Sequence, residues 1–391
     1  MNVELYLHLI IKKKLLKGML IKEMKYSYND ISIVPAIVSN VEHRSECNPY
    51  TDKLGDSTLP IFTAPMSTVV NLENFELFEQ NKIVPILPRN ISLEKRIEYL
   101  HRGKWVAVGL DEFYNLFIEL DWDFERYPNV NVLIDIANGH MKKMLNYVYE
   151  AKCKYNWLNT FKIMAGNIAN PQTYYEYARA GVDICRLNIG TGEGCITWSN
   201  LGVGYPVASL INEVYEIKQK LEYIGENTPL IVADGGIRGS KDIMISLALG
   251  SDYVMIGGLL SKLVESAAPT FYYKKLMEKH DINPFEHKIE ALNDGTFVID
   301  DNEVIDNLHK VFYGMASRKG QQDLYGVKKR TSEGIEKTFN CTSNLSKWKE
   351  NITENIQSLM SYLNCFYIED VNPKNVKCIL ISPQTRQSIN K

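Results

Sequence analysis

Residues 230–258 read LIVADGGIRGSKDIMISLALGSDYVMIGG, and this stretch decides the fold. It begins with a short apolar run that ends in Asp234-Gly235-Gly236. A helical pattern follows over Ser240–Leu249, and a second apolar run then ends in Gly257-Gly258. Short apolar runs bounded by Gly and Asp are typical of strands buried on both faces. Strand, helix and strand in this order predict parallel strands joined by a right-handed crossover.

The same alternation extends outward over most of the chain. Six further apolar runs precede residue 230: Ile61–Met66, Ile83–Leu87, Trp105–Leu110, Val130–Ala137, Phe161–Asn167 and Asp183–Gly190. Helical stretches between them include His140–Tyr155, Pro171–Ala180 and Ser209–Tyr223. Eight runs in about 200 residues predict an α/β fold, a closed (β/α)8 TIM barrel whose active-site turns lie at the C-terminal rim.

The composition is that of a globular protein. Of 391 residues, 45% are hydrophobic and 23% charged, which excludes a wholly disordered or fibrous chain. A net charge of −3 gives no basic field for nucleic acid or a membrane surface. The seven cysteines are scattered without a CxxC pair, so we expect reduced thiols in a cytoplasmic protein.

The ends of the chain differ from its middle. We expect an N-terminal extension over residues 1–24, one domain over 25–382 with a mobile flap at about 314–345, and a tail over 383–391. No run reaches the roughly 18 apolar residues that span a bilayer. The extension mixes Leu and Ile with lysines, which fits a short amphipathic helix, an optional segment before Met24, or a helix that binds a membrane surface or a partner.

The late part of the chain loses the strand–helix alternation. Residues 296–305 predict a hairpin with acidic turn residues. Residues 314–334 are polar and unperiodic, which predicts a long loop that acts as a lid or a link. A helix is expected over residues 345–364, and a β-rich tail over Val376–Ser382.

Two features of the predicted rim point to chemistry. The glycine pairs 235–236 and 257–258 follow adjacent late strands, where backbone N–H groups can approach a phosphate closely, although each pair also suits a plain tight turn. Leu187–Thr197 reads LNIGTGEGCIT, a Gly-rich loop that carries Cys195. A thiol at a rim loop is a candidate nucleophile, and Thr197 a candidate proton relay, whereas a buried thiol only packs.

Motifs along most of the chain resemble the IMP dehydrogenase/GMP reductase family. The Gly-rich loop and the following Gly202–Pro206 (GVGYP) together resemble the active-site loop of that family. Further similar segments occur in the family's order: Tyr28–Ile31, His43–Glu46, Ala64–Val69, Leu133–Gly139, Ile163–Asn167, Ala233–Gly236, Met255–Gly258 and Phe312–Met315. The resemblance covers about residues 25–365 and implies a purine-nucleotide oxidoreductase on a TIM barrel.

Three features favour the reductase branch of the family. Dehydrogenases usually carry a regulatory CBS pair after the second barrel strand, but only about 17 residues separate Leu87 from Trp105. They also carry Arg-Tyr on the flap, where this chain has Leu324-Tyr325. Arg330–Gly334 (RTSEG) is similar to the RASEG segment of GMP reductases, and GVGYP also matches that branch.

The resemblance therefore implies NADPH-dependent reductive deamination of GMP to IMP and ammonia. Two alternatives stay open: a NAD-dependent IMP dehydrogenase without the CBS pair, and an inactive regulator that binds purine nucleotides. A deoxy or modified purine nucleotide is a further possible substrate. The family also implies a homotetramer, while the charge balance predicts no nucleic-acid or membrane partner and the cysteines predict a cytoplasmic protein.

The resemblance assigns roles to individual residues. Cys195 would attack C2 of the purine and form a thioimidate, and Thr197 with Glu333 would pass the proton that ammonia needs to leave. Residues implied to bind the nucleotide are Asp234, Gly235, Gly236, Gly257, Gly258, Tyr313, Gly314, Met315, Arg330, Ser332 and Gly334. Residues implied to bind NADPH are Arg44, Arg89, Asp135, Ile136, Ala137, Ile189, Gly190, Ser358 and Ser361. The carbonyls of Gly190, Gly192 and Cys195 would hold K+.

Several of these residues also have plain structural interpretations. Asp135 suits the end of its strand, Arg330 and Glu333 suit a solvated flap surface, and Met315 suits packing. Two positions depart from the family pattern. Ser67 stands where the first-strand motif usually carries Asp, and Pro88 stands where His often precedes the basic residue. Proline cannot donate or relay a proton, so the departure at Pro88 bears on the proton and cofactor network.

Overall fold

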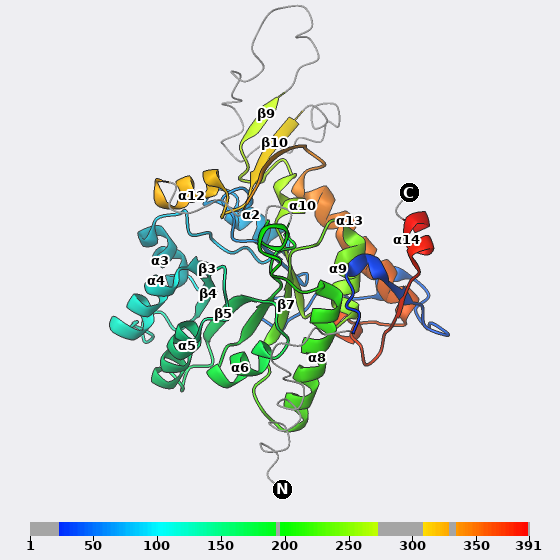
Figure 1. Cartoon of the computed structure of the whole chain (residues 1–391), viewed down its shortest axis with the longest axis horizontal. Coiled ribbons are helices and arrows are strands. Elements are labelled where there is room, and N and C mark those ends of the chain that lie inside the picture. The colour runs from blue at the N-terminus through cyan, green and yellow to red at the C-terminus, as the bar shows by residue number, and fades with distance from the viewer. Residues whose placement is uncertain (1–22, 193–195, 273–307, 328–333, 390–391) are drawn as a thin grey trace, which may run out of the picture.

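The apolar runs form a curled parallel sheet in a computed structural model of the chain, which describes residues 23–192, 196–272, 308–327 and 334–389 (Figure 1). The order along the sheet is β2-β8-β7-β6-β5-β4-β3. The strands are β2 (Ile61–Thr63), β3 (Trp105–Val108), β4 (Val130–Asp135), β5 (Phe161–Ile168), β6 (Ile184–Leu187), β7 (Leu230–Asp234) and β8 (Tyr253–Ile256). Seven of the eight predicted strands are thus confirmed.

The eighth run, Ile83–Leu87, lies between the two edge strands without forming a ladder. Single parallel bridges join Val84 to Phe62 of β2 and Leu87 to Val106 of β3. The carbonyl of Val84 accepts a 3.0 Å hydrogen bond from the N–H of Thr63. Pro85 stands in the middle of this run and has no N–H to donate, which explains why the pairing is reduced to bridges.

Both faces of the sheet are buried, as the apolar runs predict. Along β4, the side chain of Leu133 belongs to a cluster enclosed by the curl of the sheet, with Phe62 of β2 and Val232 of β7. Its neighbours Val132 and Ile134 belong to the larger cluster that includes the helices. Successive side chains of a strand point to opposite faces, so one strand contributes residues to both clusters.

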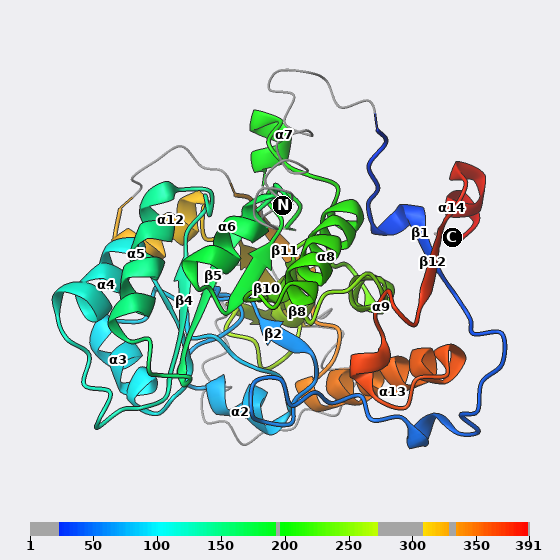
Figure 2. The ribbon, with the colours of Figure 1, turned by 90° about the horizontal axis from the view of Figure 1, so that it is seen from below.

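Helices between the strands pack on the outer face of the sheet (Figures 1 and 2). Their apolar residues recur with helical spacing, and buried positions such as Leu210, Ile211 and Val214 of α8 face the sheet side. They are α2 (Phe75–Gln80), α3 (Leu93–His101), α4 (Leu110–Tyr114), α5 (Lys142–Lys154), α6 (Thr173–Ala180), α8 (Val207–Tyr223) and α9 (Ser240–Ala248). Two short helices differ: α7 (Thr197–Leu201) buries none of its residues, and α10 (Gly258–Ser261) follows β8. The 3-10 helices η1 (Tyr28–Asp30) and η2 (Arg44–Glu46) and the π-helix η3 (Asn115–Glu119) complete this part of the chain.

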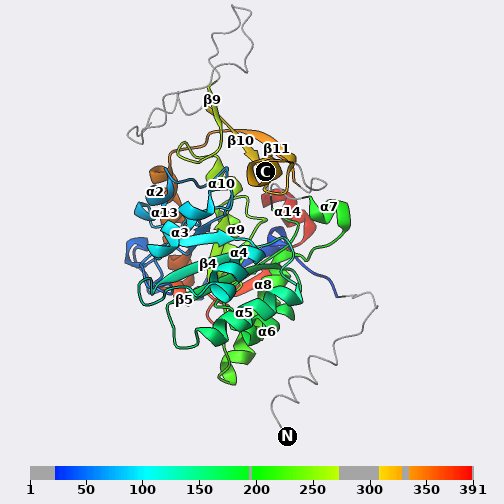
Figure 3. The same cartoon turned by 90° about the vertical axis from the view of Figure 1, so that its left-hand side faces the viewer.

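A separate antiparallel sheet, in the order β11-β10-β9, stands beyond one end of the central sheet (Figures 1 and 3). It contains β9 (Thr270–Tyr272), β10 (Leu308–Tyr313) and β11 (Glu336–Asn340). The hairpin predicted over residues 296–305 lies outside the described residues. The long loop predicted over 314–334 is wrong in part, because α12 (Arg318–Tyr325) forms within it. Ser317 caps this helix by accepting a hydrogen bond from the N–H of Gly320.

The C-terminal part packs beside the N-terminal arm. The predicted late helix is confirmed as α13 (Leu345–Leu363), and the β-rich tail as β12 (Lys377–Leu380). β12 pairs antiparallel with β1 (Ile31–Val34), so the two ends of the described chain meet. The remaining elements are η5 (Ile368–Asp370) and α14 (Pro383–Ile389).

Candidate functional site

A cavity of about 210 Å³ lies at the C-terminal ends of the parallel strands; we call it the rim cavity. Met66 lines it from the segment after β2, and Arg186 from β6. It brings together seven of the residues predicted to bind a nucleotide: Asp234, Gly235, Gly236, Gly257, Gly258, Gly314 and Met315. The two glycine pairs, predicted from adjacent late strands, therefore share one cavity.

The backbone geometry of the first glycine pair favours glycine, and the second pair has a close neighbour. Gly235 and Gly236 have φ angles of +85° and +77°, in the left-handed region that other residues rarely adopt. A methyl group at Gly257 would lie 3.0 Å from the Met66 sulfur. The bare backbone therefore faces the cavity without side-chain cover, which suits close contact with an anionic oxygen.

Three charged side chains form what we call the carboxylate floor: Arg186 and the two carboxylates that it joins, Asp135 and Asp234. Arg186 donates from Nη1 to Asp135 Oδ1 at 2.7 Å and from Nε to Asp234 Oδ2 at 2.8 Å. Its side chain is only 9% exposed. Burial alone would lower the pKa of Arg186, but the two carboxylates raise it above its ordinary value, so the guanidinium stays charged.

Arg186 of this floor and its neighbour Asn167 were not predicted as site residues. Arg186 is the one charged residue in the apolar strand Ile184–Leu187, and that contrast is a signal that could have identified it. Asn167, at the rim end of β5, donates from Nδ2 to Asp234 Oδ2 at 2.7 Å. Asp234 thus accepts hydrogen bonds from two side chains, which fixes its carboxylate at the cavity wall.

The Gly-rich loop approaches the cavity through Gly192, which lines it. Asn188 starts this loop with a φ of +95°, and its Nδ2 donates to Thr191 Oγ1. Its Oδ1 is buried and has no partner among the described residues. Cys195 lies outside the described residues, three positions beyond Gly192, and Thr197 begins α7 on the other side of that gap.

A larger hollow adjoins the rim cavity and shares Gly192 and Gly236 with it. Three cationic residues line the hollow, namely Arg238, Lys241 and Lys337, against one acidic residue, Asp242. The excess of positive charge lies beside the first glycine pair, where a phosphate would gain from it. The sequence analysis did not assign these basic residues.

The segment after β10 reaches the rim from the other side of the chain. Tyr313, unlike its neighbours Gly314 and Met315, does not line the rim cavity; its hydroxyl donates to Asp323 of α12 at 2.5 Å. The N–H of Gly314 donates to the carbonyl of Ile335 at 3.3 Å, which places buried Gly334 close to the cavity wall. Arg330, Ser332 and Glu333 lie outside the described residues.

The residues predicted to bind NADPH fall into two groups. Near the rim, Arg89 donates from Nη1 to the carbonyl of Asp135 at 3.1 Å, and its buried Nε has no partner among the described residues. Ile136 and Ala137 follow Asp135, and Ile189 and Gly190 belong to the Gly-rich loop.

The second group lies on α13 and on η2 beside it, and α13 is on the opposite side of the molecule from α3 and α4 (Figures 1 and 2). Arg44 contacts Ser358 at 3.3 Å and forms a 2.8 Å ion pair with Glu354. Ser361 donates from Oγ to the carbonyl of Ser358. Arg44, Ser358 and Ser361 therefore do not line the rim cavity of their own chain.

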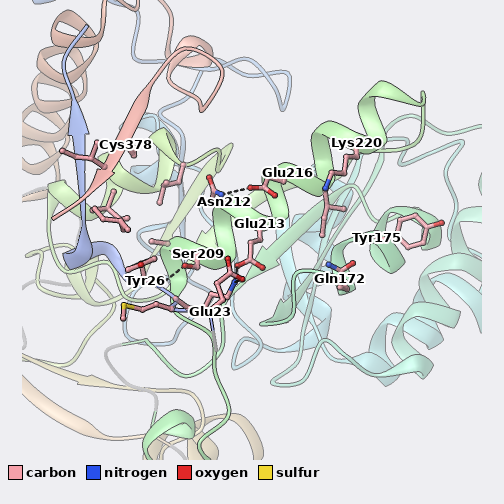
Figure 4. A pocket seen from close by; sticks show the side chains of 18 of the residues that line it. Glu23, Tyr26, Gln172, Tyr175, Ser209, Asn212, Glu213, Glu216, Lys220 and Cys378 are labelled. Carbon is pink, nitrogen blue, oxygen red and sulfur yellow. Dashed lines mark hydrogen bonds and ion pairs between the residues drawn. The ribbon is translucent and has the colours of Figure 1, made fainter. Parts of the chain in front are cut away.

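A further pocket of about 450 Å³ lies away from the rim, between α8, β12 and residues 23–26 (Figure 4). Tyr26 donates from its N–H to Ser209 Oγ there, and Asn212 donates to Glu216. None of the residues predicted for the site lines it.

Within the described ranges, no group of three or more His, Cys, Asp or Glu side chains could hold a metal ion. Among the helices of those ranges, none is long and apolar enough to cross a membrane.

Comparisons with known proteins agree with the geometry of the rim. The family described as "IMP dehydrogenase / GMP reductase domain" matches residues 127–281, which include β4 to β8 and the Gly-rich loop. The GMP reductase of Staphylococcus epidermidis is 33% identical over 255 residues, covering 63% of this chain and 74% of that protein. GMP reductases of an Exiguobacterium species (32%; 63% of this chain, 73% of that protein) and of Pediococcus pentosaceus (31%; 63% and 74%) are also similar. The chain therefore belongs to the IMP dehydrogenase/GMP reductase family.

Proposed function

We propose that this protein is an NADPH-dependent GMP reductase, which converts GMP to IMP and ammonia on a barrel closed by the bridged run Ile83–Leu87. The observation that carries the proposal is the rim cavity. It joins two glycine pairs, a fixed carboxylate at Asp234 and the entrance of the loop that leads to Cys195. The similarity to proteins named GMP reductase supports the same reaction.

The residues of the rim suit a nucleoside monophosphate. Backbone N–H groups of the glycine pairs would bind the phosphate, with Arg238 and Lys241 nearby to balance its charge. Asp234 would accept hydrogen bonds from the ribose hydroxyls through the oxygen that Arg186 and Asn167 leave free. The purine would then lie toward Met315 and the Gly-rich loop.

Cys195 would add to C2 of the purine, and loss of the 2-amino group would leave a thioimidate. The leaving nitrogen needs a proton, which Thr197 and Glu333 would supply. A covalent intermediate divides one difficult substitution into two easier steps. NADPH, when bound, supplies the hydride that releases the thiol as IMP forms.

The described site residues suit both NADPH and K+, the two groups that the proposed reaction implies. Arg89, with an unpartnered buried Nε, and Asp135 would face the cofactor near the rim. The Gly-rich loop offers neutral oxygens, the carbonyls of Gly190 and Gly192 and Asn188 Oδ1, which has no partner among the described residues; carbonyl oxygens can replace the hydration shell of K+. The third carbonyl, of Cys195, lies outside the described residues.

Arg44, Ser358 and Ser361 would act on the cofactor bound to a neighbouring copy. They do not line the rim cavity of their own chain, so a second subunit of a homotetramer would place them beside Asp135. Gel filtration with light scattering would show a tetramer, and a monomer that turns over would contradict this part of the proposal.

Turnover assays test the reaction directly. Purified protein is supplied with GMP and NADPH, or with IMP and NAD, and the absorbance of the reduced nicotinamide is followed. We expect oxidation of NADPH with GMP; reduction of NAD with IMP would establish the dehydrogenase alternative. Binding of GMP without turnover under either condition would favour the regulator alternative.

Substitution of the predicted nucleophile tests the mechanism. Cys195→Ala should abolish turnover and leave GMP affinity nearly unchanged, whereas Cys153→Ala, an exposed thiol on α5, should have no effect. Turnover by the Cys195→Ala variant would remove the cysteine from the mechanism. Glu333→Gln should slow ammonia release more than hydride transfer, and equal slowing of both steps would exclude the proton relay.

A further inference from the structure

Helix α12 packs directly on the segment that lines the rim cavity. A methyl group at Gly320 would lie 2.5 Å from the carbonyl oxygen of Gly314 and 2.7 Å from the Cα of Met315. Contact this close leaves no layer of side chains between the helix and the cavity wall. Movement of α12 would therefore move Gly314 and Met315.

Asp323 connects α12 to two other elements through one carboxylate oxygen. Its Oδ2 accepts a 2.5 Å hydrogen bond from the hydroxyl of Tyr313, the last residue of β10. The same oxygen lies 3.4 Å from Ser67 Oγ, on the segment that follows β2. The Ser67 hydroxyl is also 3.6 Å from the sulfur of Met315, which lines the cavity. The contacts of Asp323 therefore lead through Ser67 to the cavity wall.

The environment of Asp323 suits a charged acceptor. Tyr313 is only 4% exposed, and burial together with the hydrogen bond to Asp323 raises the pKa of Tyr313 to about 12, so its hydroxyl remains a donor. Lys319 lies over the Tyr313 ring at 4.9 Å. Asp323 itself is exposed, so it needs no buried counterion.

The residue at position 67 determines which element supplies the carboxylate of this contact. Residue 67 is a serine, whose hydroxyl can donate a hydrogen bond but supplies no carboxylate of its own. The carboxylate at this gap therefore comes from α12 and not from the rim segment. A carboxylate on either side of the gap would accept hydrogen bonds from the same neighbours.

We propose that Asp323 is a positioning residue of the nucleotide site, whose carboxylate holds Ser67 and Tyr313 together and thereby fixes Met315 against the bound purine. The inference rests on the proposed function and adds a residue to it. Asp323 does not line the rim cavity, so it acts through Met315 and Ser67. Its effect belongs to nucleotide affinity and not to the chemical step.

Kinetics of four variants test the proposal. Asp323→Ala should raise KM for GMP about tenfold, the effect of losing a charge-assisted hydrogen-bond pair, with kcat changed less than about threefold. Ser67→Asp should also raise KM, because two carboxylates would then face each other at 3.4 Å. The double variant Ser67→Asp/Asp323→Ala should restore KM to within about threefold of the wild type. Gln322→Ala, its exposed neighbour on α12, serves as the matched control and should match the wild type.

Each outcome has a distinct meaning. An unchanged KM in Asp323→Ala, or a double variant no better than Asp323→Ala, would overturn the inference while leaving the GMP reductase assignment in place. Wild-type protein that neither binds nor reduces GMP would overturn the proposed function. Hydrogen exchange measured without nucleotide then still decides the local claim, because Asp323→Ala should speed exchange of the α12 amides and Gln322→Ala should not.

Discussion

The carboxylate floor and the cover formed by α12 both hold carboxylates by hydrogen bonds, yet they differ in burial. Arg186 lies within a strand of the central sheet and is 9% exposed, whereas Asp323 is exposed on an eight-residue helix. A buried charge has lost its hydration and depends on its partners, while an exposed one keeps water as an alternative. We therefore expect changes in the floor to affect folding and activity together, and changes in the cover to affect mainly nucleotide affinity.

The largest expected effect comes from Arg186→Met. Removal of the guanidinium leaves Asp135 and Asp234 without the cation that bonds to both. Loss of one partner from a buried ion pair costs about 3–5 kcal/mol of unfolding free energy. Urea denaturation followed by circular dichroism measures this difference.

Arg186→Lys is the matched control for that substitution. Lysine keeps the charge but cannot donate in two fixed directions, so it should restore part of the stability and little of the activity. An Arg186→Met protein as stable as the wild type would show that the floor is not a buried ion pair in solution.

Lys310 is a buried lysine on β10, the strand that leads to α12, and gives the second prediction. Its Nζ donates to the carbonyls of Val264 and Ser266 at 2.7 and 3.2 Å, with Glu265 and Cys341 as the nearest titratable groups. Burial lowers the pKa of Lys310 to about 8, below its ordinary value of 10.5. Between these values the unfolded chain binds more protons, so stability should rise with pH through this window and be lost as pH falls toward 8.

Comparison with Lys310→Met isolates that contribution. From about pH 7 to about pH 9.5, the wild type should gain on the order of 2 kcal/mol relative to the variant. Burial raises the pKa of Cys341 to about 11, so its thiol stays protonated in the folded protein over this range. Parallel pH profiles of unfolding free energy would mean that Lys310 has the same pKa in the folded and unfolded states, as a hydrated ammonium group would.

The sequence predicted where the strands beside the carboxylate floor end, but not the hydrogen bonds that Arg186 makes. Strands β7 and β8 are continuous apolar runs with Gly or Asp at their ends, so their boundaries and the glycine pairs could be read directly. The role of Arg186 was not predicted because its partners lie on β4 and β7, 51 and 48 residues away in sequence. Pairing across a sheet depends on register, which a single sequence does not state.

The cover was harder to predict for a different reason. α12 has eight mostly polar residues and an internal Gly320, within a stretch without an apolar period, so the pattern predicted a loop. Its stability comes from the Ser317 cap and from packing on Gly314 and Met315. Tertiary contact of this kind leaves little trace in local sequence.

Gly320→Ala tests that packing and should have a moderate effect. Alanine favours a helix over glycine by about 1 kcal/mol, so an isolated α12 would gain. In the protein, the added methyl group would lie 2.5 Å from the Gly314 carbonyl oxygen, and overpacking of this kind costs about 1–3 kcal/mol. We expect lower thermal stability and a raised KM for GMP, measured beside Gln322→Ala. A stabilised variant would mean that α12 does not press on the cavity wall.

The smallest stability effect should come from Arg44→Ala. The ion pair of Arg44 with Glu354 is half exposed on both sides, and such pairs contribute about 0–1 kcal/mol. Arg102, which pairs with Glu76 at similar exposure, is a matched control with no predicted role in the site. If Arg44 reaches the cofactor of a neighbouring subunit, Arg44→Ala should raise KM for NADPH several-fold while Arg102→Ala does not, and melting temperatures should stay alike. Equal KM values would leave Arg44 as a surface residue, and the cofactor would then be bound by the rim group alone.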